Sequence, residues 1–134
     1  IENFWVEFKD GKVVRVGAEK NQDMLEKMVA MDEGASYLGE VALIAYDSPI
    51  NKTGILFYNT LFDENASCHL ALGRGFNNCL ENYENYTNEE CEKLGVNSSM
   101  IHVDFMIGSK DLSIVGVTKD GKRVQIFKDG NWAF

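Results

Sequence analysis

The pattern His102-x-Asp104, within the run "MIHVDFMIG", combines two residue types that bind metal ions. The run reads as a strand, and because strand side chains alternate between two faces, His102 and Asp104 share one face. Their Cα atoms are then about 7 Å apart, which lets an imidazole nitrogen and a carboxylate oxygen reach the same ion. The same pattern is also typical of a solvent-facing polar stripe, so it needs further ligands to indicate a metal site.

Glu40 is the second unusual residue. It is the only charged residue in the apolar run from Tyr37 to Tyr46, and no Lys or Arg lies nearby in the sequence. A carboxylate buried in such a strand is costly unless a cation pairs with it. A divalent metal ion is one such partner. The alternative is that Glu40 only caps a strand end or faces water.

The stretch "LFDENASCHLALG", residues 61–73, adds further candidate ligands in Asp63, Glu64 and His69. Taken alone, "DENAS" is also typical of an ordinary turn, and nothing in the residues decides between Asp63 and Glu64 as a ligand. His69 joins the HVD pattern on one face if the two strands are neighbours. The residues leave that pairing open.

The three cysteines, Cys68, Cys79 and Cys91, are irregularly spaced and include no CxxC pair. They therefore indicate neither a disulfide framework nor a structural zinc site. Cys68 lies among strand-forming residues, and we expect it to pack inward as a small apolar side chain.

The candidate ligands lie on strands that a larger framework must hold. Alternating residues around Asp10-Gly11 predict a hairpin, and the same turn dipeptide at 120–121 and 129–130 predicts hairpin structure at the other end. Gly34 closes one predicted amphipathic helix. Pro49 is expected in a loop. The predicted strands between these features are residues 39–46, 68–73 and 100–108, and the predicted helices lie within 21–35 and 87–95, the second with a capping box at Thr87 and Glu90.

These elements predict an α+β fold, a mostly antiparallel sheet with hairpins at both ends and about two packed helices. The 134 residues and 45% apolar content suit a single domain over residues 1–134. The chain begins at Ile1 inside a strand-like pattern, and we expect it to be part of something longer.

The net charge of −8, with Lys and Arg scattered singly, argues against a nucleic-acid partner. It suits a cationic substrate, a metal ion or simple solubility. No apolar run approaches the roughly 20 residues that a bilayer helix needs, and no leader pattern is present. We expect a cytoplasmic protein without a membrane partner.

Several motifs together resemble the C-terminal catalytic region of the M29 family of metallo-aminopeptidases, the thermophilic-type aminopeptidases. These motifs are "LGEVAL", "LFYNTLFDENASCHLALG", "MIHVDFMIGS" and "DGNWA", in the family's order and approximate spacing. The resemblance covers essentially the whole chain. It implies an enzyme that removes the N-terminal residue of peptides through a water activated by two metal ions, and it suggests a homodimer.

The resemblance also implies which residues bind the metal ions, and it selects Glu64 over Asp63. Zinc or cobalt suits two imidazoles with several carboxylates, and manganese also remains open. Glu40 and Glu64 are the catalytic candidates, with the general base either Glu64 or a glutamate upstream of this chain. The implied metal ligands are Glu40, Glu64, His69, His102 and Asp104.

The chain departs from the family in two ways. The family takes one further glutamate ligand from an upstream segment that is not present here. It also tends to have a tyrosine where this chain has Phe76, which cannot donate a hydrogen bond. Tyr83 or Tyr86 is an alternative source of that hydroxyl. Both departures favour the rival hypothesis, an inert module that retains the fold as a binding or oligomerisation domain.

Overall fold

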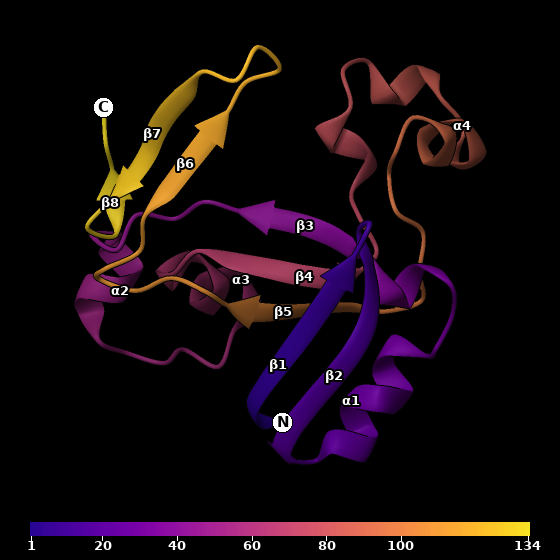
Figure 1. The fold of residues 1–134 in the computed structure, drawn as a ribbon, viewed down its shortest axis with the longest axis horizontal. Coiled ribbons are helices and arrows are strands. Elements are labelled where there is room, and N and C mark those ends of the chain that lie inside the picture. Colours follow the sequence, from indigo (N-terminus) through magenta and orange to yellow (C-terminus); the bar gives the residue numbers. More distant parts are fainter. The chain divides into compact units, whose positions relative to one another are not determined.

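The computed structural model describes residues 1–134, and the contacts within the chain divide it into two compact units. The first unit comprises residues 1–40 and 71–104, and the second comprises residues 41–70 and 105–134. The strands form three antiparallel sheets, accompanied by short helices (Figure 1). This confirms the α+β fold class.

The chain opens on the predicted hairpin, formed by β1 (Glu2–Lys9) and β2 (Lys12–Lys20). Asp10 and Gly11 have φ angles of 51° and 81°, in the left-handed region that a two-residue hairpin turn requires. Glycine reaches this region without a steric penalty, and aspartate tolerates it better than most residues. The Asp10-Gly11 dipeptide therefore fixes the hairpin.

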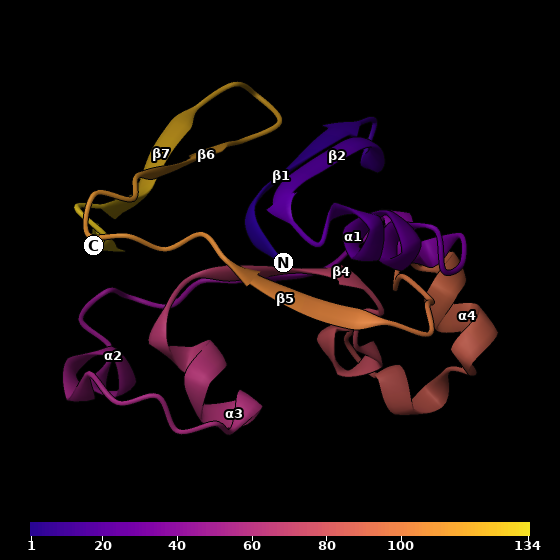
Figure 2. The same cartoon turned by 90° about the horizontal axis from the view of Figure 1, so that it is seen from below.

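The predicted amphipathic helix is α1 (Gln22–Val29), which lies beside β2 (Figure 2) and buries Leu25. It ends earlier than the sequence pattern suggests, several residues before Gly34. The reason is Asp32, whose Oδ1 accepts a hydrogen bond from the backbone nitrogen of Ala35 at 2.8 Å. This side-chain bond offers the backbone an alternative to continuing the helix.

The second predicted helix is α4 (Asn88–Lys93), and it begins with the predicted capping box. The nitrogen of Glu90 donates to Oγ1 of Thr87, and the nitrogen of Thr87 donates to Oε2 of Glu90. These two bonds satisfy donors that would otherwise lack partners at the start of the helix. The helix buries Cys91 in the core of the first unit.

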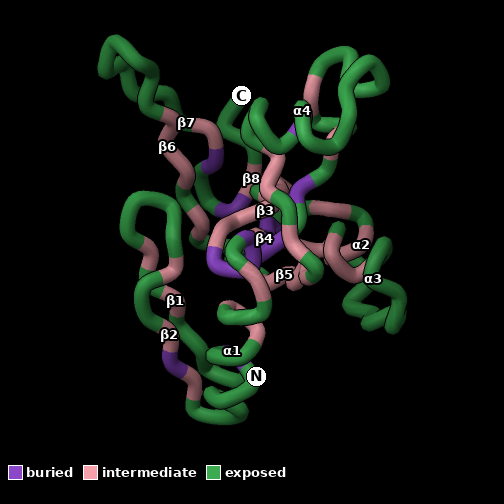
Figure 3. The backbone as a smooth tube through the Cα atoms, turned by 90° about the vertical axis from the view of Figure 1, so that its right-hand side faces the viewer, coloured by how far each residue is buried: buried purple, intermediate pink, exposed green.

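The second sheet has the order β3-β4-β5. The buried positions of the chain concentrate on β4 and the residue before it (Figure 3). The strand predicted over 39–46 ends earlier, because the backbone of Ile44 bonds to the side chain of Cys68. Sγ of Cys68 accepts from the nitrogen of Ile44 and donates to the carbonyl oxygen of Ile44, each at 3.2 Å. The strands of this sheet are β3 (Leu38–Ala42), β4 (His69–Gly73) and β5 (His102–Met106).

The prediction that Pro49 lies in a loop is wrong. Pro49 is the first residue of α2 (Pro49–Thr53), a position where its fixed φ suits the helix and its missing N–H costs nothing. Ser48 caps this helix by accepting from the backbone nitrogen of Asn51 at 3.0 Å. A further short helix, α3 (Thr60–Asp63), follows. None of the helices has the length and apolar character needed to cross a lipid bilayer.

The last sheet is formed by β6 (Ile114–Val117), β7 (Arg123–Lys128) and β8 (Asn131–Trp132), as the two Asp-Gly dipeptides predict. Its turns use left-handed backbone at Gly121, Asp129 and Gly130. Phe127 is fully buried in the second unit, and its ring centroid lies 4.5 Å from that of Trp132.

Candidate metal centre

Three of the predicted ligands meet in the first unit, and we call Glu40, His102 and Asp104 the triad. Nε2 of His102 lies 3.2 Å from Oε2 of Glu40 and 3.2 Å from Oδ1 of Asp104. The one-face placement of His102 and Asp104 along β5 is therefore confirmed. One ligand atom from each of the three residues lies within 4.8 Å of the other two.

The triad side chains are partly withdrawn from water. The exposed fractions are 27% for Glu40, 26% for His102 and 17% for Asp104. Two carboxylates in such a setting repel each other more strongly than they would in bulk water. The arrangement therefore favours a cation between the oxygens, and it leaves that cation reachable from solvent.

The imidazole of His102 is held in one tautomer. Its Nδ1 lies 2.6 Å from the carbonyl oxygen of Arg74, and a carbonyl oxygen can only accept a hydrogen bond. Nδ1 must therefore carry the ring proton, and Nε2 of the neutral ring presents its lone pair to the two carboxylates. A backbone carbonyl on one ring nitrogen with the other nitrogen free to bind is the usual environment of a metal-binding histidine.

Asp104 supplies independent support for a bound cation. Its Oδ1 is buried and receives no hydrogen bond, even though Nε2 of His102 is 3.2 Å away. In the neutral ring, protonation at Nδ1 leaves no hydrogen to offer at Nε2. A buried carboxylate oxygen without a donor is destabilising. A divalent cation that binds both atoms removes this cost, so the triad fits a metal ion.

Phe76 is the aromatic residue next to the triad. Its ring centroid lies 5.0 Å from that of His102 with the planes tilted by 59°, and its exposed fraction is 46%. Tyr83 and Tyr86 are the alternative sources of a phenolic hydroxyl. Tyr83 begins a short 3₁₀ turn, Tyr86 follows it, and each is 42% exposed. Phe76 thus lies beside the triad, where it offers an apolar ring face and a tyrosine would offer a hydroxyl.

The other two predicted ligands, Glu64 and His69, belong to the second unit. Glu64 is half-buried at the start of a 3₁₀ turn. His69 begins β4 and is 2% exposed, with Nδ1 3.0 Å from the carbonyl oxygen of Ser67. By the argument used for His102, this contact makes Nδ1 the donor.

Two residues of the same stretch have structural roles. Asp63 accepts hydrogen bonds from the backbone nitrogens of Phe57 at 2.8 Å and Asn59 at 3.0 Å, so it caps the loop. Cys68 is 1% exposed, and its sulfur is engaged with Ile44. The expectation that Cys68 packs inward is confirmed. Asp63 is satisfied by its own backbone neighbours, which is consistent with Glu64 as the ligand.

Sequence reasoning missed the carbonyl oxygen of Arg74, which fixes the tautomer of His102. A backbone acceptor has no residue-type signature. The only available signal was the pair of glycines on either side of Arg74 in "GRG", because glycine often marks a position where another part of the chain comes close to the backbone.

Comparisons with known proteins agree with this chemistry. Residues 1–132 match the family described as thermophilic metalloprotease (M29). The chain is 57% identical over 134 residues to aminopeptidase AmpS of Bacillus subtilis (strain 168), covering 100% of this chain and 33% of that protein. It is 46% identical over 132 residues to aminopeptidase T of Thermus aquaticus, covering 98% of this chain and 32% of that protein. Among solved structures, wild-type AmpT from Thermus thermophilus matches with a TM-score of 0.81 and 41% identity, over 98% of this chain and 32% of that chain. The chain thus spans about a third of the length of these relatives.

Proposed function

Because the chain belongs to the M29 family of thermophilic metalloproteases, we propose that it is the metal-binding portion of a longer, metal-dependent aminopeptidase. The proposed reaction is hydrolysis of the N-terminal peptide bond of a peptide. The names of the relatives as aminopeptidases support this assignment.

The observation that carries the proposal is the donor set of the triad. Oδ1 of Asp104 is buried without a hydrogen bond, and Nε2 of His102 turns a lone pair toward the same space. Hydrogen bonding within the chain does not satisfy these atoms, whereas a divalent cation does. One imidazole nitrogen with two carboxylate oxygens is a suitable ligand set for zinc or cobalt, and manganese is a further candidate.

We also propose Glu64 and His69 as metal ligands, as the resemblance implies, in an enzyme that uses two ions. Metal ions in such a site supply Lewis acidity toward the peptide carbonyl and make water a stronger nucleophile at neutral pH. Because Nδ1 of His69 donates to the carbonyl oxygen of Ser67, Nε2 is the nitrogen that would bind an ion. Glu64 is the candidate proton acceptor of this chain. The carboxylate of Asp63 accepts backbone hydrogen bonds in this turn, whereas the carboxylate of Glu64 accepts none there.

Specificity for the chain end follows from charge. The free amino group of a peptide is cationic near neutral pH, and the acidic surroundings of the site attract it. We propose that the substrate enters with this group toward the triad, which excludes peptides with a blocked N-terminus. The net charge of −8 strengthens the same attraction at longer range.

The test uses the full-length protein that contains this chain. A peptide with a free N-terminus should be cleaved one residue from that end, and its N-acetylated copy should not. Chelation should abolish cleavage, and zinc or cobalt should restore it. Glu40→Ala and His102→Ala should each lose both metal and activity, whereas Glu84→Ala, at an exposed site outside the triad, should lose neither. Full activity in the two triad variants would contradict the proposal.

A further inference from the structure

We propose that Asn97 is a positioning residue that fixes the tautomer and orientation of His102 through the loop Gly73-Arg74-Gly75. The effect on metal binding rests on the proposed function. The effect on the tautomer of His102 does not, because it concerns the metal-free protein. All of these residues belong to the first unit.

Asn97 forms hydrogen bonds with this loop on both sides of Arg74. Its side-chain Nδ2 donates to the carbonyl oxygen of Gly73 at 2.6 Å, and its backbone oxygen accepts from the nitrogen of Gly75 at 2.8 Å. Arg74 lies between these two anchors, and its own carbonyl oxygen is the atom that accepts from Nδ1 of His102. The Asn97 contacts therefore determine where that carbonyl points.

Two further bonds complete the support. The nitrogen of Arg74 donates to the carbonyl oxygen of Ile101 at 2.7 Å. The nitrogen of Gly73 donates to the carbonyl oxygen of Tyr37 at 2.8 Å. Gly73 has a φ angle of 97°, which ordinary side chains rarely adopt. Every polar backbone atom from the nitrogen of Gly73 to the nitrogen of Gly75 thus has a partner, and Asn97 provides two of them.

The carboxamide of Asn97 is the right group for this task. Its Nδ2 has two hydrogens, and the second one is donated to the carbonyl oxygen of Gly34 at 2.8 Å. Aspartate at this position has no hydrogen to donate when ionised, and it would place negative charge against two carbonyl oxygens. Alanine would leave both carbonyls without these donors. Asn97 therefore links its own backbone, the backbone at Gly34 and the loop that carries the Arg74 carbonyl.

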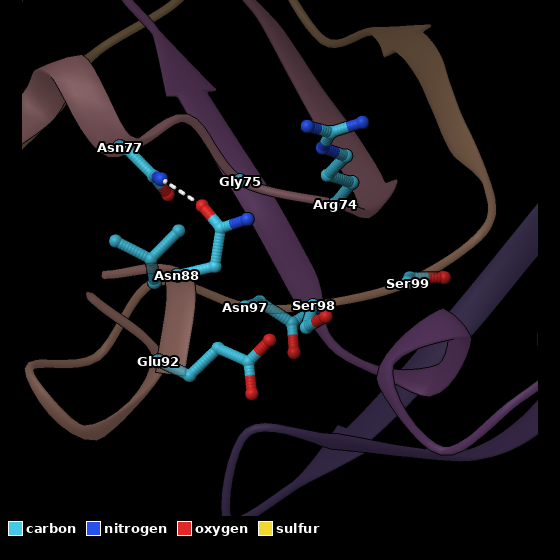
Figure 4. A pocket seen from close by; sticks show the side chains of 9 residues that line it. Arg74, Gly75, Asn77, Asn88, Glu92, Asn97, Ser98 and Ser99 are labelled. Carbon is cyan, nitrogen blue, oxygen red and sulfur yellow. Dashed lines mark hydrogen bonds between the residues drawn. The ribbon is translucent and has the colours of Figure 1, made fainter. Parts of the chain in front are cut away.

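The surroundings offer a matched control. Asn97 lines a pocket of about 200 Å³ together with Arg74 and Asn88 (Figure 4). In the same pocket Nδ2 of Asn77 donates to Oδ1 of Asn88 at 2.9 Å, and neither asparagine has a hydrogen bond with the Gly73-Arg74-Gly75 loop. Asn88→Ala therefore removes an amide bond of the same type from the same pocket and leaves the loop intact.

The test measures the tautomer of His102 in the metal-free full-length protein. Histidine is labelled with nitrogen-15 in its ring and studied by NMR at alkaline pH, where it is neutral, with His102 assigned from the His102→Gln variant. The wild-type protein should show the proton on Nδ1, and so should Asn88→Ala. Asn97→Ala should shift His102 to a mixture of tautomers and weaken the binding of zinc by about 10- to 100-fold, the usual effect of losing support behind a ligand.

The possible outcomes separate this inference from the proposed function. A proton on Nε2 of His102 in the wild type overturns the inference whether or not any variant folds. A folded Asn97→Ala variant with the wild-type tautomer and zinc affinity also overturns it. If the wild type shows the predicted tautomer but binds no metal, the proposed function fails. The positioning role of Asn97 is still decided by the Asn97→Ala spectrum, or by an Asn97→Asp spectrum if Asn97→Ala does not fold, because ionised aspartate donates neither hydrogen bond.

Discussion

The Nδ1 atom of His102 lies 2.6 Å from the carbonyl oxygen of Arg74, while its Nε2 lies 3.2 Å from the carboxylate of Asp104. These two contacts define the centre, because a neutral ring that donates from Nδ1 faces Asp104 with the lone pair of Nε2. With the ring neutral, two groups that cannot hydrogen-bond to each other lie side by side in a partly buried position. This arrangement lowers the stability of the metal-free chain and creates a binding site for a cation, as is common at functional sites.

Metal removal should lower the thermal stability of the full-length protein. An ion that binds only the folded state adds RT ln(1 + [L]/Kd), about 2.7 kcal/mol at a hundredfold excess over the dissociation constant. Calorimetry with zinc, with chelator and with zinc restored measures the effect. An unfolding midpoint that does not depend on zinc would mean that no ion stabilises the fold.

Asp104→Asn should stabilise the metal-free protein. The substitution removes one of two carboxylates whose oxygens lie within 4.8 Å of each other, and we expect a gain of about 1 kcal/mol. With zinc present the order should reverse, because the wild type then gains binding energy that the variant lacks. Urea unfolding in both conditions provides the measurement. Asp111→Asn, at an exposed acid of the second unit, should change neither value.

Asp32 should make the first unit sensitive to acid. The hydrogen bond from the backbone nitrogen of Met100 lowers the pKa of Asp32 below its ordinary value of 3.8, and bonds from Ser99 and Ala35 act in the same direction. Because the pKa is depressed in the folded state, the stabilisation is fully present above pH 3.8 and is lost as the pH falls through the folded-state pKa.

The corresponding measurement is urea unfolding as a function of pH. Asp32→Asn should be less stable than the wild type near neutral pH, and the difference should shrink as the solution is acidified below the pKa of Asp32. A difference that stays constant down to the most acidic condition would show that the ionisation of Asp32 contributes nothing. Asp111→Asn again serves as the control.

Gly39→Ala should disturb the metal centre from the side of β3. A Cβ atom at Gly39 would overlap the carbonyl oxygens of Gly73 and Arg74, so the loop that orients His102 must move. We expect a loss of about 1 to 3 kcal/mol in stability together with weaker zinc binding.

Gly54→Ala separates the two effects of that substitution. Gly54 lies in the second unit with a φ angle of 62°, and a Cβ there would meet open space. Alanine at this left-handed position should cost about 1 to 2 kcal/mol through backbone strain. Zinc affinity should stay unchanged. Equal loss of zinc affinity in the two variants would mean that general destabilisation, and not the loop, controls the site.

Much of the fold could be predicted from the sequence because its signals are local. Asp10-Gly11 specifies a turn by backbone conformation, and Thr87 with Glu90 specifies a helix start through two hydrogen bonds. The triad residues could also be singled out, since His102 and Asp104 share a strand face and Glu40 is an isolated charge in an apolar run.

The features that could not be predicted depend on contacts between distant residues. The strand that begins at Leu38 ends at Ala42 because Ile44 bonds to Cys68, and no local pattern encodes that contact. The helix at Pro49 was hidden because proline signals a break in most settings and a helix start in only one. The role of the Arg74 carbonyl depends on a loop that closes only when the chain is folded.

The most direct test of the metal centre is the metal content of the purified full-length protein, measured by elemental analysis for the wild type, His102→Gln, Asp104→Asn and the control Asp111→Asn. The centre predicts near-stoichiometric zinc or cobalt in the wild type and the control, and a clear loss in the two triad variants. Equal metal content in all four proteins, or none in the wild type after it is supplied with zinc, would contradict the assignment of Glu40, His102 and Asp104 as metal ligands.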